Sequence, residues 1–239
     1  MTGEILFPEF ASIFGDVGNM ILFKQCCKSM KFVETSFSET PLFVKEDVDF
    51  IYLGSMSEPK QVLTVNKLKP YKERIKELMD KGTVFLITGN ALEIFGDYIE
   101  DKDGRSEGLG LFHFHAERDY EKRVNFIMLS EFEGMKIIGV QSQFCQVKGI
   151  ENNHFLTMIK GMGDYKGSKF EGIHYKNFFA TYTLGPLLVQ NPDFTRYLMN
   201  LLGLKDELVF EEALYDAYKE RLRKLEHQDA PVDLGLHGF

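Results

Sequence analysis

Hydrophobic positions in the first hundred residues alternate between short apolar runs and longer stretches with helical spacing. Residues 5–7, 48–53 and 83–88 are short apolar runs, each closed by proline or glycine, and they predict buried strands. In residues 20–30 and 68–81, apolar side chains recur every three or four positions, which predicts amphipathic helices. Strands that alternate with helices favour a parallel sheet with helices packed against it.

The pattern changes from about residue 108, where short strands are separated by turn residues. The expected strands cover residues 109–114, 124–129, 136–140, 155–159, 172–175 and 177–182. This spacing is closer to an antiparallel meander than to strand–helix–strand units. Two helices are expected after it, one opening at Asn191-Pro192 and ending at Gly203, and one over residues 206–226. The sequence therefore predicts an α/β fold with a mixed sheet, parallel in its first part and with an antiparallel extension.

Ligands of parallel sheets bind beyond the carboxyl ends of the strands. This rule directs attention to the loops that follow Phe7, Leu53 and Thr88. The strand over residues 83–88, the turn at Gly89-Asn90 and a short helix over residues 91–98 have the local order of a nucleophile elbow. Asp16 and Asn19 are expected to cap the first helix and to brace the loop before it.

The composition of the chain indicates which binding partners and which cellular compartment to expect. The chain has 36 acidic and 28 basic residues and a formal net charge of −8, which argues against a nucleic-acid-binding surface. Three cysteines, Cys26, Cys27 and Cys145, without a C-x-x-C pair fit a reducing compartment and do not suggest a zinc site. No signal peptide and no apolar stretch long enough for a membrane span is evident, so we expect a cytoplasmic protein.

Four segments resemble class I glutamine amidotransferases, in the right order over about residues 4–203. They are Leu6-Phe7-Pro8-Glu9 with Gly15-Asp16-Val17-Gly18-Asn19, residues 49–54, residues 84–96, and residues 172–192 (GIHYKNFFATYTLGPLLVQNP). The sequence is most similar to the glutaminase subunits of lipid II isoglutaminyl synthase (GatD) and to cobyric acid synthase-like glutaminases. The resemblance implies a flavodoxin-like amidotransferase domain over residues 1–203, followed by a C-terminal helix and tail over residues 204–239.

The resemblance also implies a site. In this family a cysteine thiolate attacks the carboxamide of glutamine, a histidine transfers the proton, and two backbone amides hold the oxyanion. Here the nucleophile position aligns with Gly89 and the histidine position with Leu184. Asn90 and Ala91 replace two family glycines, and Glu93 replaces a glutamine. The glycine-rich loop has become Gly54-Ser55-Met56-Ser57. A family arginine has no counterpart in residues 139–146, where Gln146 is near its place.

These replacements remove the family's chemistry, because glycine offers no nucleophile and leucine transfers no proton. No cysteine lies between Cys27 and Cys145, so no shift of the alignment restores one. We expect no catalytic residue, no metal and no cofactor. The expected remnant is a vestigial pocket around Gly89 and Leu184, formed by Gly54, Ser55, Thr88, Asn90, Ala91 and Gln146. Such a pseudoenzyme would act as a structural or regulatory partner of a Mur-ligase-like amidating subunit, or would bind a small-molecule ligand.

Two alternatives remain open at this point. Family membership alone suggests an active glutaminase subunit that supplies ammonia for amidation of a cell-wall or cobyrinate-type acceptor. A third hypothesis is a different hydrolase or metal-dependent enzyme that uses His113 and His115, with Glu117 next on the same side of a predicted strand. The plainer interpretation of these residues is a solvated strand face, and that of Cys145 is a small buried filler.

Overall fold

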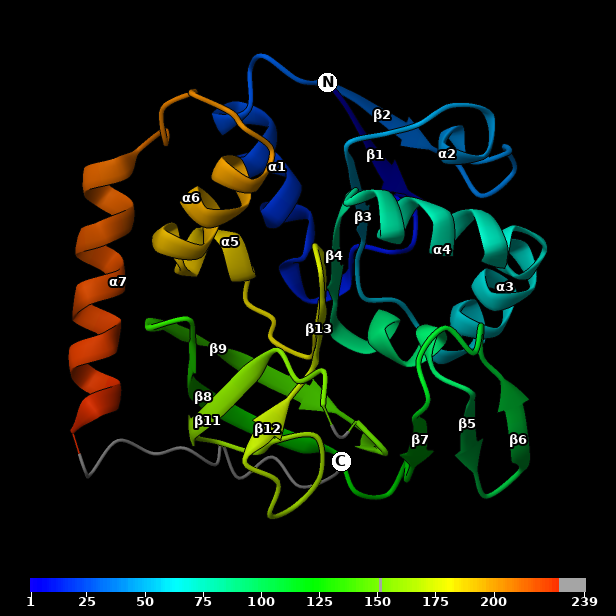
Figure 1. The fold of residues 1–239 in the computed structure, drawn as a ribbon. Coiled ribbons are helices and arrows are strands. Elements are labelled where there is room, and N and C mark those ends of the chain that lie inside the picture. The colour runs from blue at the N-terminus through cyan, green and yellow to red at the C-terminus, as the bar shows by residue number, and fades with distance from the viewer. Residues whose placement is uncertain (151, 228–239) are drawn as a thin grey trace.

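A computed structural model describes residues 1–150 and 152–227, and its centre is a six-stranded sheet (Figure 1). The strand order is β13-β14-β4-β3-β1-β2, and every pairing is parallel except that of the edge strand β13. The strands are β1 (Thr2–Leu6), β2 (Lys31–Thr35), β3 (Phe50–Leu53), β4 (Val84–Thr88), β13 (Ile173–Tyr175) and β14 (Phe178–Thr181). The four residues of β3 and the five of β4 are all buried, as their continuous apolar sequences require.

Helices cover both faces of this sheet (Figure 1). One face carries α1 (Val17–Cys26), α5 (Leu187–Gln190) and α6 (Pro192–Leu201), which share a hydrophobic core with β1, β3 and β4. The other face carries α2 (Leu42–Lys45), α3 (Glu58–Leu68) and α4 (Lys72–Lys81), which form a second core. Two layers of helix therefore bury the central sheet between them.

Two smaller sheets follow in the chain. The first has the order β10-β7-β5-β6, from β5 (Tyr98–Asp101), β6 (Gly104–Glu107), β7 (His115–Arg118) and β10 (Cys145–Lys148). The second is antiparallel with the order β12-β11-β8-β9, from β8 (Val124–Phe132), β9 (Met135–Gln143), β11 (Leu156–Lys160) and β12 (Phe170–Glu171). The last helix, α7 (Glu211–Glu226), packs Tyr218 and Leu225 against β8 and β9.

The expected fold class is confirmed, while several element predictions are wrong. The helix predicted over residues 68–81 is shorter than expected, because α4 begins at Lys72, after the short 3₁₀ helix (Lys69–Tyr71) that contains Pro70. Residues 58–68 form a separate helix that was not predicted. Residues 109–114 are not a strand, because Gly110 has φ = 59° and the amides of residues 109–112 donate to the carbonyls of residues 94–96. Tyr98 begins a strand and does not end a helix. The predicted tail over residues 228–239 lies outside the described residues.

Asn191 stands at the N-cap position of α6 with Pro192 after it, but its side chain does not cap the helix. Its Oδ1 accepts a hydrogen bond from the Ile138 amide at 2.8 Å, and its Nδ2 donates to the Ile138 carbonyl at 2.8 Å. The side chain thus fastens α6 to the middle of β9. None of the helices in the described part of the chain is long and apolar enough to cross a membrane.

Two carboxyl groups are buried together where the glycine-rich loop over residues 161–167 returns to β12. Glu171 accepts a hydrogen bond from the Tyr182 amide at 2.6 Å, and its other oxygen lies 2.7 Å from the Thr181 hydroxyl. Burial raises the pKa of Glu171 to about 7, against the opposing effect of these two hydrogen bonds. Burial, together with the charge of Glu171, also raises the pKa of Asp164 well above its ordinary value. The folded chain therefore favours protonated carboxyls here.

We expect Glu171→Gln to remove a pH-dependent loss of stability. An unfolded glutamate ionises near pH 4.5, whereas Glu171 in the folded chain keeps its proton to about pH 7. In that window the unfolded state binds fewer protons, so the contribution of Glu171 to stability falls as pH rises. The free energy of unfolding of the variant relative to the native chain should therefore increase by up to about 3 kcal/mol between pH 5 and pH 7.5.

Urea unfolding at half-unit pH steps measures this difference. The matched control is Glu107→Gln, at an exposed position of β6, which should keep a constant offset from the native chain. A Glu171→Gln offset that stays constant with pH contradicts the assignment.

Candidate functional site

The turn after β4 lies at the carboxyl edge of the central sheet, where the sequence places the nucleophile elbow. Gly89 follows the last residue of β4 with φ = 62°, and the chain continues as a 3₁₀ helix (Gly89–Phe95). The loop that begins with Gly54 and Ser55 follows β3 beside it, and Leu184 follows β14 on the other side. Three segments that are far apart in sequence thus meet at one point because their strands are parallel neighbours.

Leu184 is also tied to the second small sheet. Its amide donates to the Val140 carbonyl at 2.8 Å, and the Val140 amide donates to the Leu184 carbonyl at 3.2 Å. This antiparallel bridge joins the end of the central sheet to β9. The backbone at Leu184 therefore serves as a structural link.

The space above Gly89 is filled by its neighbours. A Cβ atom at this position would lie 2.5 Å from the Cβ of Ser55 and 3.1 Å from Cδ2 of Leu184. Atoms this close overlap, and the left-handed φ at Gly89 adds strain for any residue that carries a Cβ. Ser55 and Leu184 thus occupy the volume in which a side chain at position 89 would begin.

The pocket that remains at the elbow has a volume of about 20 Å³. Its lining combines the elbow with β9 and the loop after it, and it includes Phe14, Ser55, Glu58, Gly89, Asn90, Glu93, Arg123, Ser142, Gln143, Phe144, Cys145 and Leu184. A cavity of this size holds about one water molecule. Ligand pockets are usually several hundred cubic ångströms in volume, so this pocket is far smaller than an ordinary small-molecule site.

Two amides of the former glycine-rich loop already have acceptors inside the protein. The Ser55 amide donates to Oδ2 of Asp16 at 2.8 Å. The Met56 amide donates to Oδ1 of Asn90 at 3.0 Å, and Nδ2 of Asn90 donates back to the Met56 carbonyl at 2.7 Å. An oxyanion hole needs donors that point at the reacting oxygen. These two donors are instead bonded to Asp16 and Asn90.

Asp16 is the centre of a buried polar network under the elbow. Its Oδ2 accepts hydrogen bonds from the hydroxyls of Ser55 at 2.7 Å and Thr88 at 2.8 Å. The Tyr52 hydroxyl lies 3.0 Å from that of Thr88, and Nδ2 of Asn19 donates to Tyr52 at 3.1 Å. Burial raises the pKa of Asp16, while its hydrogen bonds oppose the shift. Asp16 and Asn19 therefore brace the ends of β3 and β4. The prediction that they cap α1 is wrong, because the helix has no side-chain cap hydrogen bond.

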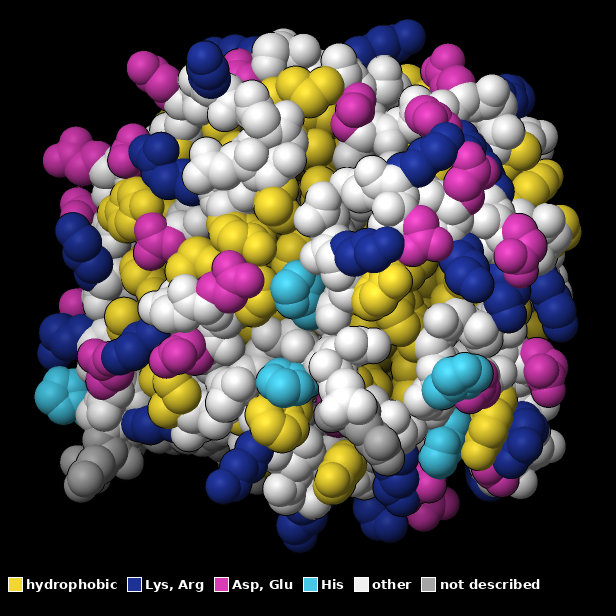
Figure 2. Space-filling model, viewed as in Figure 1, with side chains coloured by type: hydrophobic (Ala, Val, Ile, Leu, Met, Phe, Trp, Pro, Cys, Tyr) yellow, Lys and Arg dark blue, Asp and Glu magenta, His cyan; other side chains and the backbone are white. Residues whose placement is uncertain are grey.

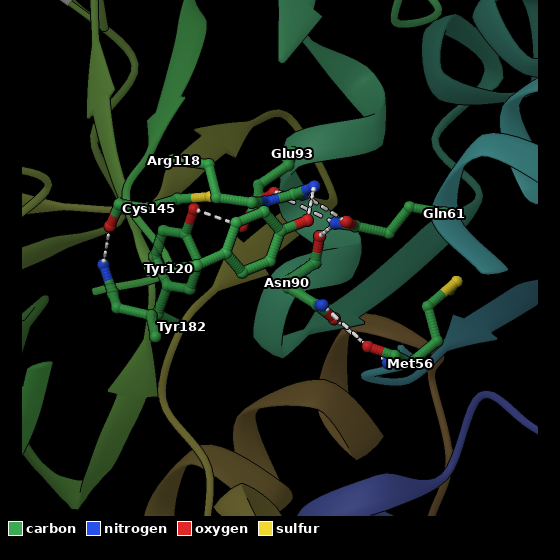
Figure 3. Close-up of polar contacts among 9 residues, drawn as sticks. Met56, Gln61, Asn90, Glu93, Arg118, Tyr120, Cys145 and Tyr182 are labelled. Atoms are coloured by element: carbon green, nitrogen blue, oxygen red, sulfur yellow. Dashed lines mark hydrogen bonds and ion pairs between the residues drawn. The ribbon is translucent and has the colours of Figure 1, made fainter. Parts of the chain in front are cut away.

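A buried ion pair lies on the other side of the elbow helix (Figure 3). Oε2 of Glu93 is 2.8 Å from Arg118, and the two side chains are only 2% and 6% exposed. Glu93 also accepts hydrogen bonds from Nε2 of Gln61 at 3.0 Å and from the Tyr182 hydroxyl at 2.9 Å. Both carboxylate oxygens are thus satisfied, which a buried charge requires.

Cys145 adjoins this ion pair and is fully buried (Figure 3). Its Sγ accepts a hydrogen bond from Nε of Arg118 at 3.3 Å. Burial and the charge of Glu93 raise the pKa of the Cys145 thiol well above its ordinary value. Because the thiolate is the reactive form of cysteine, this thiol is a poor nucleophile.

Several residues that were expected to line the elbow pocket lie outside it. Gly54 lets the loop approach residue 11, because a Cβ there would lie 2.4 Å from the Ala11 carbonyl oxygen. Ala91 is buried in the 3₁₀ helix. Gln146 lies outside the elbow pocket, in a neighbouring cleft of about 1000 Å³, where it accepts a hydrogen bond from the Lys166 amide at 3.1 Å. The structure therefore brings Ser55, Gly89, Asn90 and Leu184 together at the pocket. The other residues expected to line it do not: Gly54, Thr88, Ala91 and Gln146.

Arg123 lines the pocket and was not found from sequence. Its guanidinium lies 5.4 Å from the ring centre of Phe14 and 5.2 Å from that of Phe144, and its Nε donates to the Ser142 hydroxyl at 3.1 Å. These partners come from distant segments, so no local pattern around residue 123 could have indicated the arrangement.

The two histidines of the metal hypothesis are not arranged as a ligand pair. His113 precedes β7, with Nδ1 3.6 Å from Asp97, whereas His115 stacks on Tyr98 and has Nε2 3.4 Å from Glu117. Within residues 1–150 and 152–227, no group of three or more histidine, cysteine or acidic side chains is placed to hold a metal ion.

Comparisons with known proteins found relatives by sequence and by structure. Residues 5–192 match the CobB/CobQ-like glutamine amidotransferase domain family. The chain is 27% identical over 206 residues to the lipid II isoglutaminyl synthase (glutamine-hydrolyzing) subunit GatD of Staphylococcus aureus, covering 84% of this chain and 83% of that protein. The subunit of the same name from Streptococcus pneumoniae is 22% identical over 200 residues, covering 81% and 77% of the two chains.

A crystal structure of a glutamine amidotransferase supports the same fold. It superposes with a TM-score of 0.54 at 12% identity, and the match covers 85% of this chain and 99% of that one. At this identity the likeness concerns the arrangement of helices and strands.

We expect Arg118→Met to destabilise the protein by about 3–5 kcal/mol, because it leaves the buried charge of Glu93 without its partner. The double variant Glu93→Gln with Arg118→Met should recover most of that loss, since an uncharged amide replaces the carboxylate. Urea unfolding measures both. Arg105→Met, in an exposed pair with Glu100, is the control and should cost less than about 1 kcal/mol. Equal losses for the single and double variants would contradict this account.

Proposed function

The chain belongs to the CobB/CobQ-like glutamine amidotransferase family. We propose that it is a non-catalytic member of this family and serves as a structural or regulatory subunit of an amidating ligase. The observation that carries the proposal is the filled volume at the elbow. Ser55 and Leu184 stand where a nucleophile at position 89 would extend, and the residual cavity is about 20 Å³. Neither glutamine nor another small ligand of that size fits there.

The side chains nearby do not supply the missing chemistry. The Ser55 hydroxyl is bonded to Asp16 and to the Ile13 carbonyl, and the Cys145 thiol is bonded to Arg118. No histidine lines the elbow pocket among the described residues. Glutaminase chemistry requires a nucleophile, a proton carrier and free oxyanion donors together. Loss of either of the first two typically lowers the rate by several orders of magnitude.

The partner in this proposal is a Mur-ligase-like amidating subunit in the cytoplasm. Support comes from the two GatD relatives, each named as a subunit of lipid II isoglutaminyl synthase. Exposed apolar side chains also run from the pocket mouth along α1, namely Ile13, Phe14, Val17 and Ile21, at 37–55% exposure. Exposed apolar surface with an aromatic and an arginine nearby is typical of protein interfaces. We call these four residues the α1 strip and propose that the partner binds there.

We expect no ammonia release from glutamine by the native chain, and none by Gly89→Cys. The introduced Cβ would overlap Ser55, and Leu184 transfers no proton. An ammonia assay at millimolar glutamine measures this, with Cys145→Ala as the control for turnover by the remaining thiol. Turnover by the native chain would support the active glutaminase subunit, and turnover by Gly89→Cys would refute the role assigned to Leu184.

We expect Val17→Glu with Ile21→Glu to abolish co-purification with the Mur-ligase-like subunit from the same organism, while far-UV circular dichroism stays native. Both side chains are more than half exposed, so the fold should tolerate the change. Val62→Glu with Leu63→Glu on α3, each side chain 43% exposed, is the matched control and should leave binding intact. Binding that survives the α1 substitutions, or is lost equally in the control, would rule out the α1 strip.

A further inference from the structure

The glycine-rich loop over residues 161–167 forms one wall of the cleft of about 1000 Å³ that adjoins the elbow pocket. The loop connects β11 with β12 (Figure 1), and the opposite wall consists of β5, β7 and the start of β8. The residues that the loop and its end contribute to the cleft are Gly161, Met162, Gly163, Lys166, Gly167 and Ser168. The position of this loop therefore determines how wide the cleft is.

One residue in the middle of the loop fastens it to both small sheets. The Asp164 carbonyl accepts a hydrogen bond from the Val147 amide of β10 at 2.7 Å, and the Asp164 amide donates to the Phe170 carbonyl of β12 at 2.8 Å. Asp164 is only 3% exposed, and its Oδ1 accepts a hydrogen bond from the Gly172 amide at 2.9 Å. Asp164 is therefore the residue that holds the loop against the rest of the protein.

The buried carboxyl of Asp164 has a second carboxyl beside it and no cation. The charge of Glu171, which is fully buried on β12, acts on Asp164. Neither carboxyl has an ion-pair partner within residues 1–150 and 152–227. On the surface in Figure 2, by contrast, acidic side chains are interspersed with Lys and Arg. Two carboxylates buried together without a cation repel each other strongly, because the protein interior screens charge poorly.

The other titratable groups that face Asp164 do not compensate this repulsion. Tyr182 faces it from the segment after β14, and Cys145 belongs to β10; burial raises the pKa of both, so both stay uncharged. Lys148, the charged residue of β10, is already paired with Glu117 at 2.7 Å. Loss of the proton from Asp164 therefore leaves a buried negative charge unopposed.

Glycines at both ends of the loop allow it to move. Gly161 has φ = 100° and Gly167 has φ = 96°, and glycine rotates through this region with little steric restriction. A Cβ at Gly167 would meet no atom within 4 Å, so this end of the loop stands clear of its surroundings. Lys166 and Lys169 at the same end are exposed and do not neutralise the buried carboxyls.

We propose that Asp164 is a pH-dependent latch that holds the loop over residues 161–167 closed on the cleft. With its carboxyl protonated, the loop stays bonded to β10 and β12. Ionisation favours a conformation in which Asp164 reaches water and the loop turns outward about Gly161 and Gly167, because the buried charge and the repulsion from Glu171 are then relieved. The cleft widens on the side of Met162. This proposal does not depend on the chemistry of the elbow.

The direction of the pH dependence follows from the two environments of the carboxyl. Burial and the charge of Glu171 raise the pKa of Asp164 in the closed loop, whereas a carboxyl in water ionises near about pH 4. Between these two pKa values, opening of the loop releases one proton. The open population should therefore rise about tenfold per pH unit in that window and level off above the pKa of the closed loop.

Hydrogen exchange of the full chain, followed by mass spectrometry and corrected for the intrinsic pH dependence of amide exchange, measures this opening. Protection of residues 161–172 should fall about tenfold per pH unit between pH 5 and pH 7. Asp164→Asn keeps an oxygen that can accept from Gly172 but cannot ionise, so its protection should not change with pH. Glu121→Gln, at an exposed carboxyl of the same cleft, is the matched control and should follow the native chain.

Oxidation of Met162 by hydrogen peroxide gives a second readout on the cleft side of the loop. Met162 is 7% exposed, and its oxidation relative to the partly exposed Met135 of β9 should quicken over the same pH range in the native chain but not in Asp164→Asn.

Comparison of the loop with α3 in the native chain needs no variant, so the test remains decisive if Asp164→Asn does not fold. The proposal is overturned if protection of residues 161–172 does not fall with pH, if α3 loses protection by the same factor, if Asp164→Asn keeps the native slope, or if oxidation of Met162 does not quicken.

Discussion

Close packing at the end of β4 determines which side chains the elbow can hold. Protein interiors are packed closely, so a position that carries no side chain must be filled by its neighbours or leave a cavity that costs stability. At Gly89 the filling comes from Ser55 and Leu184. Gly89, Ser55 and Leu184 therefore form one packing arrangement. A side chain introduced at position 89 would meet atoms of both neighbours.

The backbone of the elbow turns through a left-handed conformation at Gly89. Buried polar contacts impose this conformation from both sides. Asp16 ties the start of the loop after β3 to the end of β4 through Ser55 and Thr88. On the other side, Glu93 in the elbow helix is held by Arg118, which belongs to the first small sheet. Breaking either set would leave a buried charge without compensation, so both hold the turn in place.

The sequence predicts the parts of this site that depend on local pattern and strand order. Short apolar runs followed by glycine indicate β3 and β4, and parallel pairing then places Ser55 beside Gly89. The resemblance places Leu184 at the same point. Residues 109–114 were misassigned because a run of apolar residues resembles a strand, although Gly110 turns the chain and the amides bond to an adjacent turn.

The contacts of Arg118 and Arg123 could not be predicted from the sequence, for a different reason. Their partners, Glu93 for one and Phe14 and Phe144 for the other, become neighbours only after the small sheets pack against the central sheet. The helix α3 was not predicted at all, and the helix expected over residues 68–81 begins later, at Lys72, after the 3₁₀ helix that contains Pro70. Contacts between distant segments are set by tertiary packing, which local periodicity does not encode.

The backbone bridge between Leu184 and Val140 shows how the elbow contributes to the fold. It joins the central sheet to β9, and Asn191 fastens α6 to the same strand two residues earlier. The elbow is therefore a joint at which the central sheet, the antiparallel sheet and the helices of one face are held together. Asn19 of α1 belongs to the same joint, because its Oδ1 accepts a hydrogen bond from the Leu188 amide of α5 at 2.8 Å. Its Nδ2 also donates to the Tyr52 hydroxyl of β3, so the hydrogen bonds of one side chain connect α1 with both α5 and the central sheet.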